Sequence, residues 1–300
     1  MKRHQRSSTG LHVLVTGAAS GIGRSLARRL ARHGAHLYLT DRNETGLSET
    51  VGEIRAAGGD VAFARALDIT DIDAVRAFAD DVHALTDALD AVINVAGIAI
   101  WGTVTSLTHE QWRRVIDVNL MGTVHIIESF VPAMVHGNRG GHLVNVSSAA
   151  GLIGLPWHAA YSASKFGVRG ISEVLRFDLA RHRIAVTLVC PGGVDTPLTE
   201  SVEIAGINTA SPVVRKARGA FQRRAVSPDV AAARIEAGML RRRYLVYTSE
   251  DIRLIHAVQR YLPPLYVLIM RMFNRAADAV GAKAGAPSGD QAGAQESVRR

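Results

Sequence analysis

The stretch Thr16-Gly17-Ala18-Ala19-Ser20-Gly21-Ile22-Gly23 decides the fold of this 300-residue chain. A short apolar segment, residues 12–16, leads into it, and an amphipathic segment, residues 24–30, follows it. Glycines allow a tight turn and let backbone N–H groups approach a phosphate, whose charge a helix N-terminus also favours. An isolated match would suit an ordinary glycine-rich turn, but the strand–turn–helix context favours a dinucleotide-binding loop. The loop residues predicted to contact the dinucleotide are Gly17, Ser20, Gly21, Ile22 and Gly23.

Outward from this loop, short apolar segments alternate with longer helical stretches as far as Cys190. The predicted strands are residues 12–16, 36–40, 61–67, 91–94, 142–146 and 185–189, and 244–247 could form a last short one. Such alternation is typical of a parallel sheet with helices on both faces. The sequence therefore predicts an α/β fold, a Rossmann-like doubly wound parallel sheet in a single domain, which binds ligands at the carboxyl ends of its strands.

Asp41 follows the second predicted strand, about 20 residues beyond the glycine loop. A carboxylate there can accept hydrogen bonds from both ribose hydroxyls and repel a 2′-phosphate, which favours NAD over NADP. Arg42 keeps NADP open, because a guanidinium pairs with that phosphate if the carboxylate turns away. The structural alternative for Asp41 is a helix N-cap. We expect NAD as the cofactor, with NADP as the second choice.

Tyr161 and Lys165 lie four residues apart. On a helix this spacing places both side chains on one face, about one turn apart. A free tyrosine has a pKa of about 10, and a fixed positive charge nearby favours its phenolate. Similar pairs also occur by chance on helices where the ring packs and the lysine is solvated. The pair is a candidate for proton transfer, and the surrounding sequence has to decide between this role and a chance pairing.

Six motifs in a fixed order carry a resemblance to a known family. They are Thr-Gly-x-x-x-Gly-x-Gly at 16–23, Asn-x-Ala-Gly at 94–97, Asn119, Ser147-Ser148, Tyr-x-x-x-Lys at 161–165 and Pro-Gly at 191–192. Through them the chain from Leu11 to about Thr199 resembles the single-domain short-chain dehydrogenase/reductase family. The resemblance implies an NAD(P)-dependent oxidoreductase that interconverts an alcohol and a ketone or aldehyde.

The resemblance implies four catalytic residues. Tyr161 is expected to exchange a proton with the substrate oxygen, and Lys165 to lower the tyrosine pKa and hold the nicotinamide ribose. Ser148, thirteen residues before the tyrosine, is expected to hydrogen-bond the substrate oxygen, with Ser147 as the less favoured choice. Asn119 is expected to kink its helix and hold a water that links Lys165 to solvent, or to be a buried structural amide.

The resemblance also implies further contacts to the dinucleotide. The residues concerned follow successive strands and are Asp68, Ile69, Asn94, Ala96, Gly97, Pro191, Gly192, Val194 and Thr196, together with Tyr161 and Lys165. Val194 and Thr196 are expected to bind the carboxamide. Val95 occupies a position where the family often has a second asparagine, so part of a strand-bridging polar network is expected to be missing.

Composition and charge limit the other possibilities. The chain is 47% hydrophobic and 21% charged, which is typical of a soluble globular protein. A single cysteine, Cys190, argues against a disulfide framework and a cysteine-rich metal site, and fits a cytoplasmic location. No signal-peptide pattern follows the basic N-terminus. We expect residues 1–10 to be flexible, 11–250 to form the catalytic domain, 251–280 a helical extension and 281–300 a disordered tail.

The net charge of +8 belongs to the C-terminal third, since residues 213–300 hold 16 Lys and Arg against 7 Asp and Glu. Within it, the apolar segment 261–270 contains two prolines and is too short to cross a bilayer about 30 Å thick. It could pack over the substrate cleft or against a partner subunit. Arginines beside apolar residues also suit a peripheral membrane contact. Nucleic-acid binding lacks any reading module, and we expect none.

These observations predict an NAD(P)-dependent oxidoreductase with a hydrophobic, steroid-, retinoid- or lipid-like substrate. The apolar residues expected near the cleft are Ile98, Ala99, Ile100, Trp101, Leu152, Ile153, Leu155, Trp157 and Leu198. The alternative is a dinucleotide-sensing protein that does no chemistry. A third possibility keeps the fold but changes the chemistry to that of an epimerase or dehydratase, although these enzymes usually carry longer substrate domains. The resemblance further implies a homodimer or homotetramer built through the helices that carry Asn119 and Tyr161.

Overall fold

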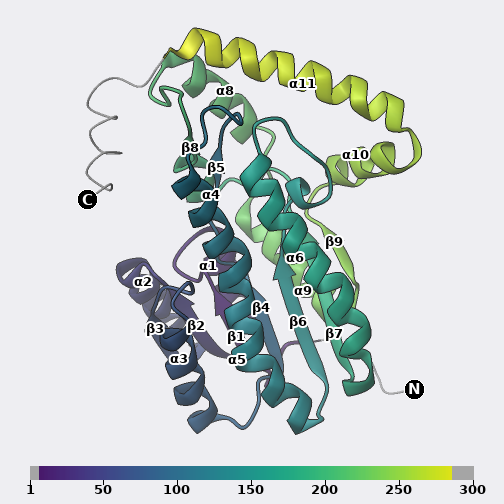
Figure 1. Ribbon diagram of the computed structural model, residues 1–300. Helices are drawn as coiled ribbons and strands as arrows, with labels where there is room; N and C mark the ends of the chain where they lie inside the picture. Colours follow the sequence, from purple (N-terminus) through teal and green to yellow (C-terminus); the bar gives the residue numbers. More distant parts are fainter. Residues whose placement is uncertain (1–6, 286–300) are drawn as a thin grey trace.

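The computed structural model describes residues 7–285 (Figure 1). Its main sheet has seven strands in the order β3-β2-β1-β4-β6-β7-β9. All neighbouring strands are parallel. The strands are β1 (His12–Thr16), β2 (His36–Asp41), β3 (Asp60–Ala66), β4 (Ala91–Asn94), β6 (Gly141–Val146), β7 (Ile184–Cys190) and β9 (Leu245–Tyr247). The predicted doubly wound sheet is confirmed, including the short last strand.

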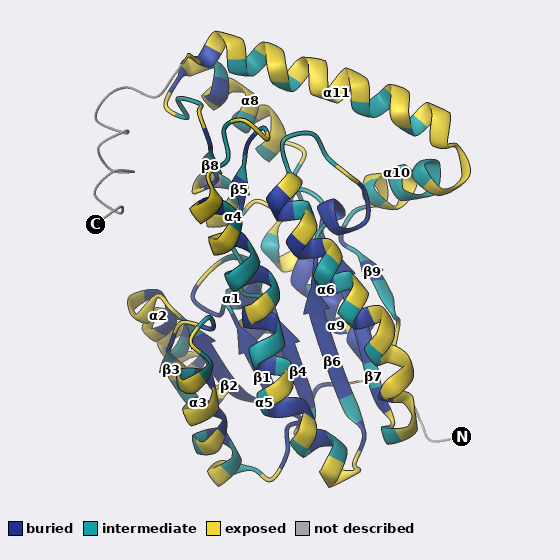
Figure 2. Cartoon of the chain, in the orientation of Figure 1, coloured by how far each residue is buried: buried dark blue, intermediate teal, exposed yellow. Residues whose placement is uncertain are grey.

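Helices cover both faces of the sheet. One face carries α1 (Gly21–Arg32), α2 (Glu44–Ala56) and α9 (Pro228–Leu240), whose apolar side chains share one buried cluster with the strands. The other face carries α3 (Ile72–Leu85), α5 (Gly122–Gly137) and α6 (Ala159–Asp178), which lie in front of the sheet in Figure 1. Because both faces are covered, the strands are almost wholly buried (Figure 2), as parallel strands require.

The remaining elements lie beyond the carboxyl ends of the strands. Ile100–Trp101 (β5) and Glu203–Ile204 (β8) form a two-stranded parallel ribbon that no sequence pattern predicted. The helices of this region are α4 (His109–Ile116), α7 (Pro197–Glu200), α8 (Pro212–Gln222), α10 (Glu250–Tyr261) and α11 (Pro263–Ala284). Figure 1 shows α11 lying across this end of the molecule as its outermost element. Across the sheet the strands run in the order β3-β2-β1-β4, so the strand order reverses between β1 and β4. Such a switch point forms a ligand crevice at the carboxyl ends of the strands.

Two predicted terminal boundaries need correction. Helix α11 continues to Ala284, so residues 281–284 are helical rather than the start of a tail, and the rest of that predicted tail, from 286, lies outside the described residues. At the other end, residues 1–6 lie outside the described part. Ser8 is fully buried and its hydroxyl donates to Glu236 Oε1 over 2.9 Å, which fixes this start of the chain against α9.

One continuous helical stretch among the described residues, His109–Gly137, is long and apolar enough to cross a membrane by length and composition alone. Its residues Ile126 and Phe130 pack into the same buried cluster as α3 and the sheet. A core helix passes the same test, so the stretch is weak evidence for a membrane span.

Candidate active site

The glycine loop forms at the carboxyl end of β1 as predicted. Gly17 and Gly21 have φ angles of 69° and 51°, which residues with a Cβ rarely adopt. A Cβ on Gly23 would lie 2.0 Å from the carbonyl oxygen of Gly17, so only glycine fits there. Thr16 ties the loop to its neighbour, because its hydroxyl oxygen accepts from the N–H groups of Val95 and Ala96 over 3.0 and 3.2 Å. The glycines therefore leave backbone exposed to a ligand at the start of α1.

The loop borders a cavity of about 370 Å³, large enough for part of a dinucleotide. Eleven of the predicted contact residues line it: Gly17, Ser20, Gly21, Ile22, Gly23, Asp41, Asp68, Ile69, Ala96, Gly97 and Thr196. Sequence reasoning did not assign a contact to other lining residues, namely Asn43, Leu67, Val95, Ile98, Val118, Pro197, Leu198 and Ser201, nor a firm one to Arg42. Because the cavity is built from loops at five strand ends, no local motif could name all of its walls.

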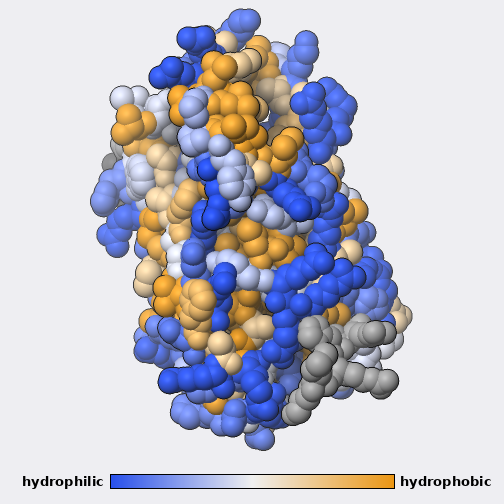
Figure 3. Space-filling view, turned by 90° about the vertical axis from the view of Figure 1, so that its right-hand side faces the viewer, coloured by the Kyte–Doolittle hydropathy of each residue, from blue (hydrophilic) through white to orange (hydrophobic). Residues whose placement is uncertain are grey.

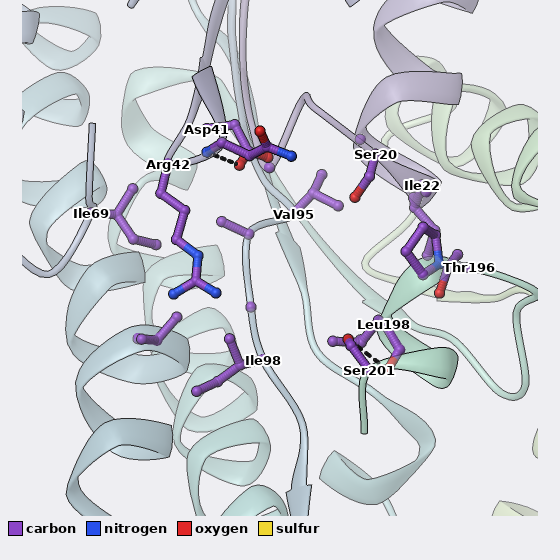
Figure 4. Close-up of a pocket in the computed structure, with 18 of the residues that line it drawn as sticks. Ser20, Ile22, Asp41, Arg42, Ile69, Val95, Ile98, Thr196, Leu198 and Ser201 are labelled. Carbon is purple, nitrogen blue, oxygen red and sulfur yellow. Dashed lines mark hydrogen bonds between the residues drawn. The ribbon is translucent and has the colours of Figure 1, made fainter. Parts of the chain in front are cut away.

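Asp41 and Arg42 enter this cavity from the end of β2 (Figure 4). One oxygen of the Asp41 carboxylate accepts from the Ala19 N–H over 3.0 Å, and the other accepts from the Asn43 N–H over 2.9 Å. These bonds hold the negative charge at the edge of the cavity, and Asn43, rather than Asp41, caps α2. Figure 4 shows the Arg42 side chain pointing into the same cavity. A dinucleotide would therefore meet both the carboxylate of Asp41 and the guanidinium of Arg42 here.

Six predicted contact residues do not line the cavity: Asn94, Pro191, Gly192, Val194, Tyr161 and Lys165. The Pro191 carbonyl accepts from the Ala149 N–H over 2.7 Å, and the Gly192 N–H donates to the Thr248 hydroxyl over 3.3 Å. Both bonds anchor the segment that leads to Thr196. A Cβ on Gly21 would lie 3.0 Å from the Thr196 side chain, so the segment crosses the crevice and reaches the glycine loop.

Asn94 belongs to a buried polar chain whose other members, Asn145 and Ser172, were not named from the sequence. Its amide donates to Asn145 Oδ1 over 2.9 Å, and the Asn145 amide donates to the Ser172 hydroxyl over 3.0 Å. These bonds link β4, β6 and α6 although Val95 replaces the second asparagine of the family pattern. A signal was present, because Asn145 interrupts an otherwise apolar strand.

Tyr161 and Lys165 lie on the first turns of α6, and both are buried. The Lys165 ammonium is 5.8 Å from the centre of the tyrosine ring and donates to the Val146 carbonyl over 3.1 Å. The Ser147 hydroxyl donates to the Lys165 carbonyl over 2.8 Å and is thereby used in packing β6 against α6. This bond leaves Ser148, the predicted residue, as the serine beside the Tyr161 phenol.

Burial dominates the electrostatics of the pair. It raises the pKa of Tyr161, although the Ser148 hydroxyl acts in the opposite direction. Burial also lowers the pKa of Lys165 to about 8. The expectation that the lysine lowers the tyrosine pKa stays a prediction, because in the protein alone burial raises that pKa. An acidic phenol at this place requires an ammonium that burial itself makes easier to deprotonate.

Asn119 occupies a π-helical segment, Asp117–Met121, between α4 and α5. Its Oδ1 accepts from the Ile98 N–H over 2.8 Å, and its Nδ2 donates to the Ile98 carbonyl and the Ser164 hydroxyl over 3.0 and 3.1 Å. The structure thus supports both the predicted helix irregularity and the buried structural amide. A Cβ on Gly97 would lie 2.9 Å from Asn119 Oδ1 and 3.3 Å from the Lys165 ammonium, so the two groups meet around this glycine.

The tyrosine is enclosed by apolar side chains. Tyr161 shares one buried cluster with residues beside the β5–β8 ribbon, in α4, in α6 and after β6, and they are Ala99, Ile100, Val115, Ala150, Ala160 and Val202. Partly buried side chains extend the cluster: Ile98, Trp101, Leu107, Trp112, Leu155 and Ile204. Leu152 and Ile153, which the sequence placed near the cleft, pack instead with Val168, Leu188 and Cys190 in the core.

Comparison with known proteins agrees with this geometry. A family model described as short chain dehydrogenase matches residues 11–205. A protein of Mycobacterium tuberculosis named putative oxidoreductase SadH is 36% identical over 264 residues, covering 87% of this chain and 94% of that protein. A 3beta-hydroxysteroid dehydrogenase of Mediterraneibacter gnavus is 40% identical over 189 residues, which is 63% of this chain and 67% of that protein.

A similar solved structure contains a nicotinamide dinucleotide. The short chain dehydrogenase/reductase of Burkholderia phymatum in complex with NAD has a TM-score of 0.76 at 28% identity, covering 85% of this chain and 96% of that chain. The cavity, the glycine loop and the fixed Asp41 carboxylate of this chain fit a nicotinamide dinucleotide. The chain therefore belongs to the short-chain dehydrogenase family of nicotinamide-dependent oxidoreductases, which act on CH–OH groups.

Proposed function

We propose that the protein interconverts a hydrophobic alcohol and the corresponding ketone or aldehyde, with NAD as the preferred cofactor. The observation that carries the substrate class is the buried apolar cluster around Tyr161, which includes Ile100 in β5 and Val202 just before β8. A sugar would leave its hydroxyl groups without partners there, at a cost of about 1–3 kcal/mol for each one buried. The name of the hydroxysteroid dehydrogenase relative supports the same class.

The residues have distinct roles in this reaction. The nicotinamide ring, when bound, supplies hydride to the carbonyl carbon or removes it from the carbinol carbon. Tyr161 donates the proton to the substrate oxygen in reduction and accepts it in oxidation. Ser148 donates a hydrogen bond to the same oxygen and so stabilises its developing charge. Lys165 in its protonated form favours the phenolate, and Asn119 positions the Ile98 segment beside it.

The preference for NAD follows from the fixed carboxylate of Asp41, which would repel a 2′-phosphate. Arg42 is the residue that would accept NADP, since no ion pair joins it to another described residue. The two contributions can be separated by measuring kcat/KM with NAD and NADP for Asp41→Ala and Arg42→Ala. We expect the first variant to shift preference towards NADP and the second to lower only the activity with NADP. A wild type that uses NADP better, and loses that preference in Arg42→Ala, would reverse the assignment.

A screen of hydrophobic alcohols and ketones with NAD and NADP, followed by the absorbance of the reduced nicotinamide, tests the activity. Tyr161→Phe should lower kcat by about 100-fold or more while cofactor binding, measured by fluorescence, stays unchanged. The rival is a dinucleotide-sensing protein. It would be favoured if the wild type bound the dinucleotide but turned over no substrate of the screen. Equal turnover by wild type and Tyr161→Phe would show that the tyrosine is not the acid/base.

We also propose that the protein forms a homodimer or homotetramer through α4–α5 and α6. Apolar side chains on the outer faces of these helices are exposed, including Met121, Phe166, Val174 and Phe177. Light scattering of Val174→Glu and Phe177→Glu variants tests the interface, because a buried charge at its centre should yield monomers.

A further inference from the structure

Helix α11 is attached to the substrate side of the site along its inner face. The Tyr266 hydroxyl donates to the Gly154 carbonyl over 2.8 Å, and the Trp157 indole donates to Asp278 Oδ1 over 3.2 Å. Near its end, the Gly285 carbonyl accepts from the Asn208 N–H over 3.2 Å. The helix thus contacts both the segment before Tyr161 and the segment beyond β8. Its orientation is fixed, and its other face is turned away from the protein.

The outer face of α11 is apolar and basic. Leu265, Leu268 and Met272 follow one another at three- and four-residue spacing and are 44%, 56% and 62% exposed. Arg271 and Arg275 are exposed as well and lie between this stripe and the inner face, where they border a hollow beside Gly154. We define these five residues as the outer stripe. Figure 3 shows hydrophobic side chains gathered between hydrophilic ones at the end of the molecule where α10 and α11 lie. A helix of this kind is suited to lie in a membrane interface.

The charges on the helix distinguish between two possible occupants. Residues 260–275 contain three arginines and no acidic residue. Asp278, the nearest carboxylate, is already bonded to Trp157 and to the Asn274 amide. A second copy of the chain packed by two-fold symmetry would place the outer stripe against itself and bring arginines close to arginines. An anionic lipid surface instead offers opposite charge to the arginines and hydrocarbon to the leucines.

We propose that the outer stripe of α11 docks on the surface of a bilayer that contains anionic lipid. The 22-residue helix, about 33 Å long, would lie in the plane of the interface, because its inner face remains bonded to the protein. The docking is independent of the substrate and of the proposed catalysis. It would bring the mouth of an apolar site close to a phase in which hydrophobic alcohols dissolve.

Flotation of the full chain with vesicles tests the proposal. We expect binding to vesicles that contain phosphatidylglycerol, little binding to pure phosphatidylcholine, and release by salt. The double variant Leu268→Glu/Met272→Glu should bind at least about 10-fold more weakly. Arg271→Gln/Arg275→Gln should lose about 30-fold on the anionic vesicles. Leu85→Glu, a similarly exposed leucine (55%) at the end of α3, is the matched control and should bind like wild type.

Two outcomes would overturn the proposal. One is a wild-type chain that does not float with anionic vesicles at low salt, or that floats equally well after Leu268→Glu/Met272→Glu. The other is loss of self-association by that variant, measured by light scattering, without vesicle binding by wild type, which would assign the stripe to a second copy. Dinucleotide binding by each variant reports whether the fold is intact, so failure of the docking and failure of the proposed catalysis can be distinguished.

Discussion

The buried ammonium of Lys165 should lower the stability of the folded protein near neutral pH. Burial lowers its pKa from an ordinary value of 10.5 to about 8, so the folded state holds the proton less tightly than the unfolded state. Stability then rises with pH between these two values, because the unfolded chain binds more protons there. A shift of one pKa unit corresponds to about 1.4 kcal/mol. The buried charge therefore costs about 3 kcal/mol near pH 7 and only about 1 kcal/mol near pH 9.5.

Lys165→Met removes this cost while keeping the shape of the side chain. It also removes the hydrogen bond from the ammonium to the Val146 carbonyl, which is worth about 1 kcal/mol. We expect the variant, without cofactor, to be about 2 kcal/mol more stable than wild type near pH 7 and about equal to it near pH 9.5. It should have almost no oxidoreductase activity, since the tyrosine loses its charged neighbour.

Urea unfolding of both proteins at the two pH values, followed by circular dichroism, measures this difference. Lys216→Met is the control, because Lys216 is exposed, and it should change stability by less than about 0.5 kcal/mol at either pH. A Lys165→Met variant that is less stable than wild type near pH 7, or a stability difference that does not change with pH, would refute the reasoning. Either result would mean that the buried ammonium finds partners that offset its desolvation.

Three further predictions follow from the geometry. Gly23→Ala should abolish dinucleotide binding in isothermal titration calorimetry, because its Cβ would meet a backbone oxygen at 2.0 Å; binding with wild-type affinity would contradict the loop geometry. Asn145→Ala should lower the free energy of unfolding by about 2–3 kcal/mol through two lost buried hydrogen bonds, and an unchanged urea midpoint would show that the polar chain is not needed. Carbonyl reduction, measured as kcat/KM, should be constant below about pH 8 and fall above it as Lys165 loses its proton, whereas a rise above pH 8 would exclude the protonated lysine as the active form.

Much of the site could be predicted because its signals are local. The glycine loop, Asp41 and the Tyr161–Lys165 pair each depend on residues within one strand end or one helical turn, where steric limits and periodicity act along the chain. The choice of Ser148 over Ser147 came from the spacing in the family that the chain resembles, and it stays a prediction. In the structure the Ser147 hydroxyl donates to the Lys165 carbonyl. The cofactor loops could therefore be predicted from the sequence without knowledge of any tertiary contact.

Other features depend on contacts between residues far apart in the chain. Asn94, Asn145 and Ser172 meet only when β4, β6 and α6 pack together. The upward pKa shift of Tyr161 is a consequence of its enclosure by segments that include Val202, forty-one residues further on. Sequence spacing can propose an ammonium beside a phenol, but desolvation depends on everything that covers the pair.

The C-terminal region shows most clearly which features the sequence determines and which depend on the tertiary structure. Its composition indicated an apolar, basic segment with several possible partners, and no pattern within it could choose among them. In the fold, Tyr266 and Asp278 bond one face of helix α11 to the segment before Tyr161. It leaves Leu268 and Met272 on the solvent side. Periodicity along a chain reports which residues share a helix face, whereas the direction of that face depends on where the rest of the protein lies.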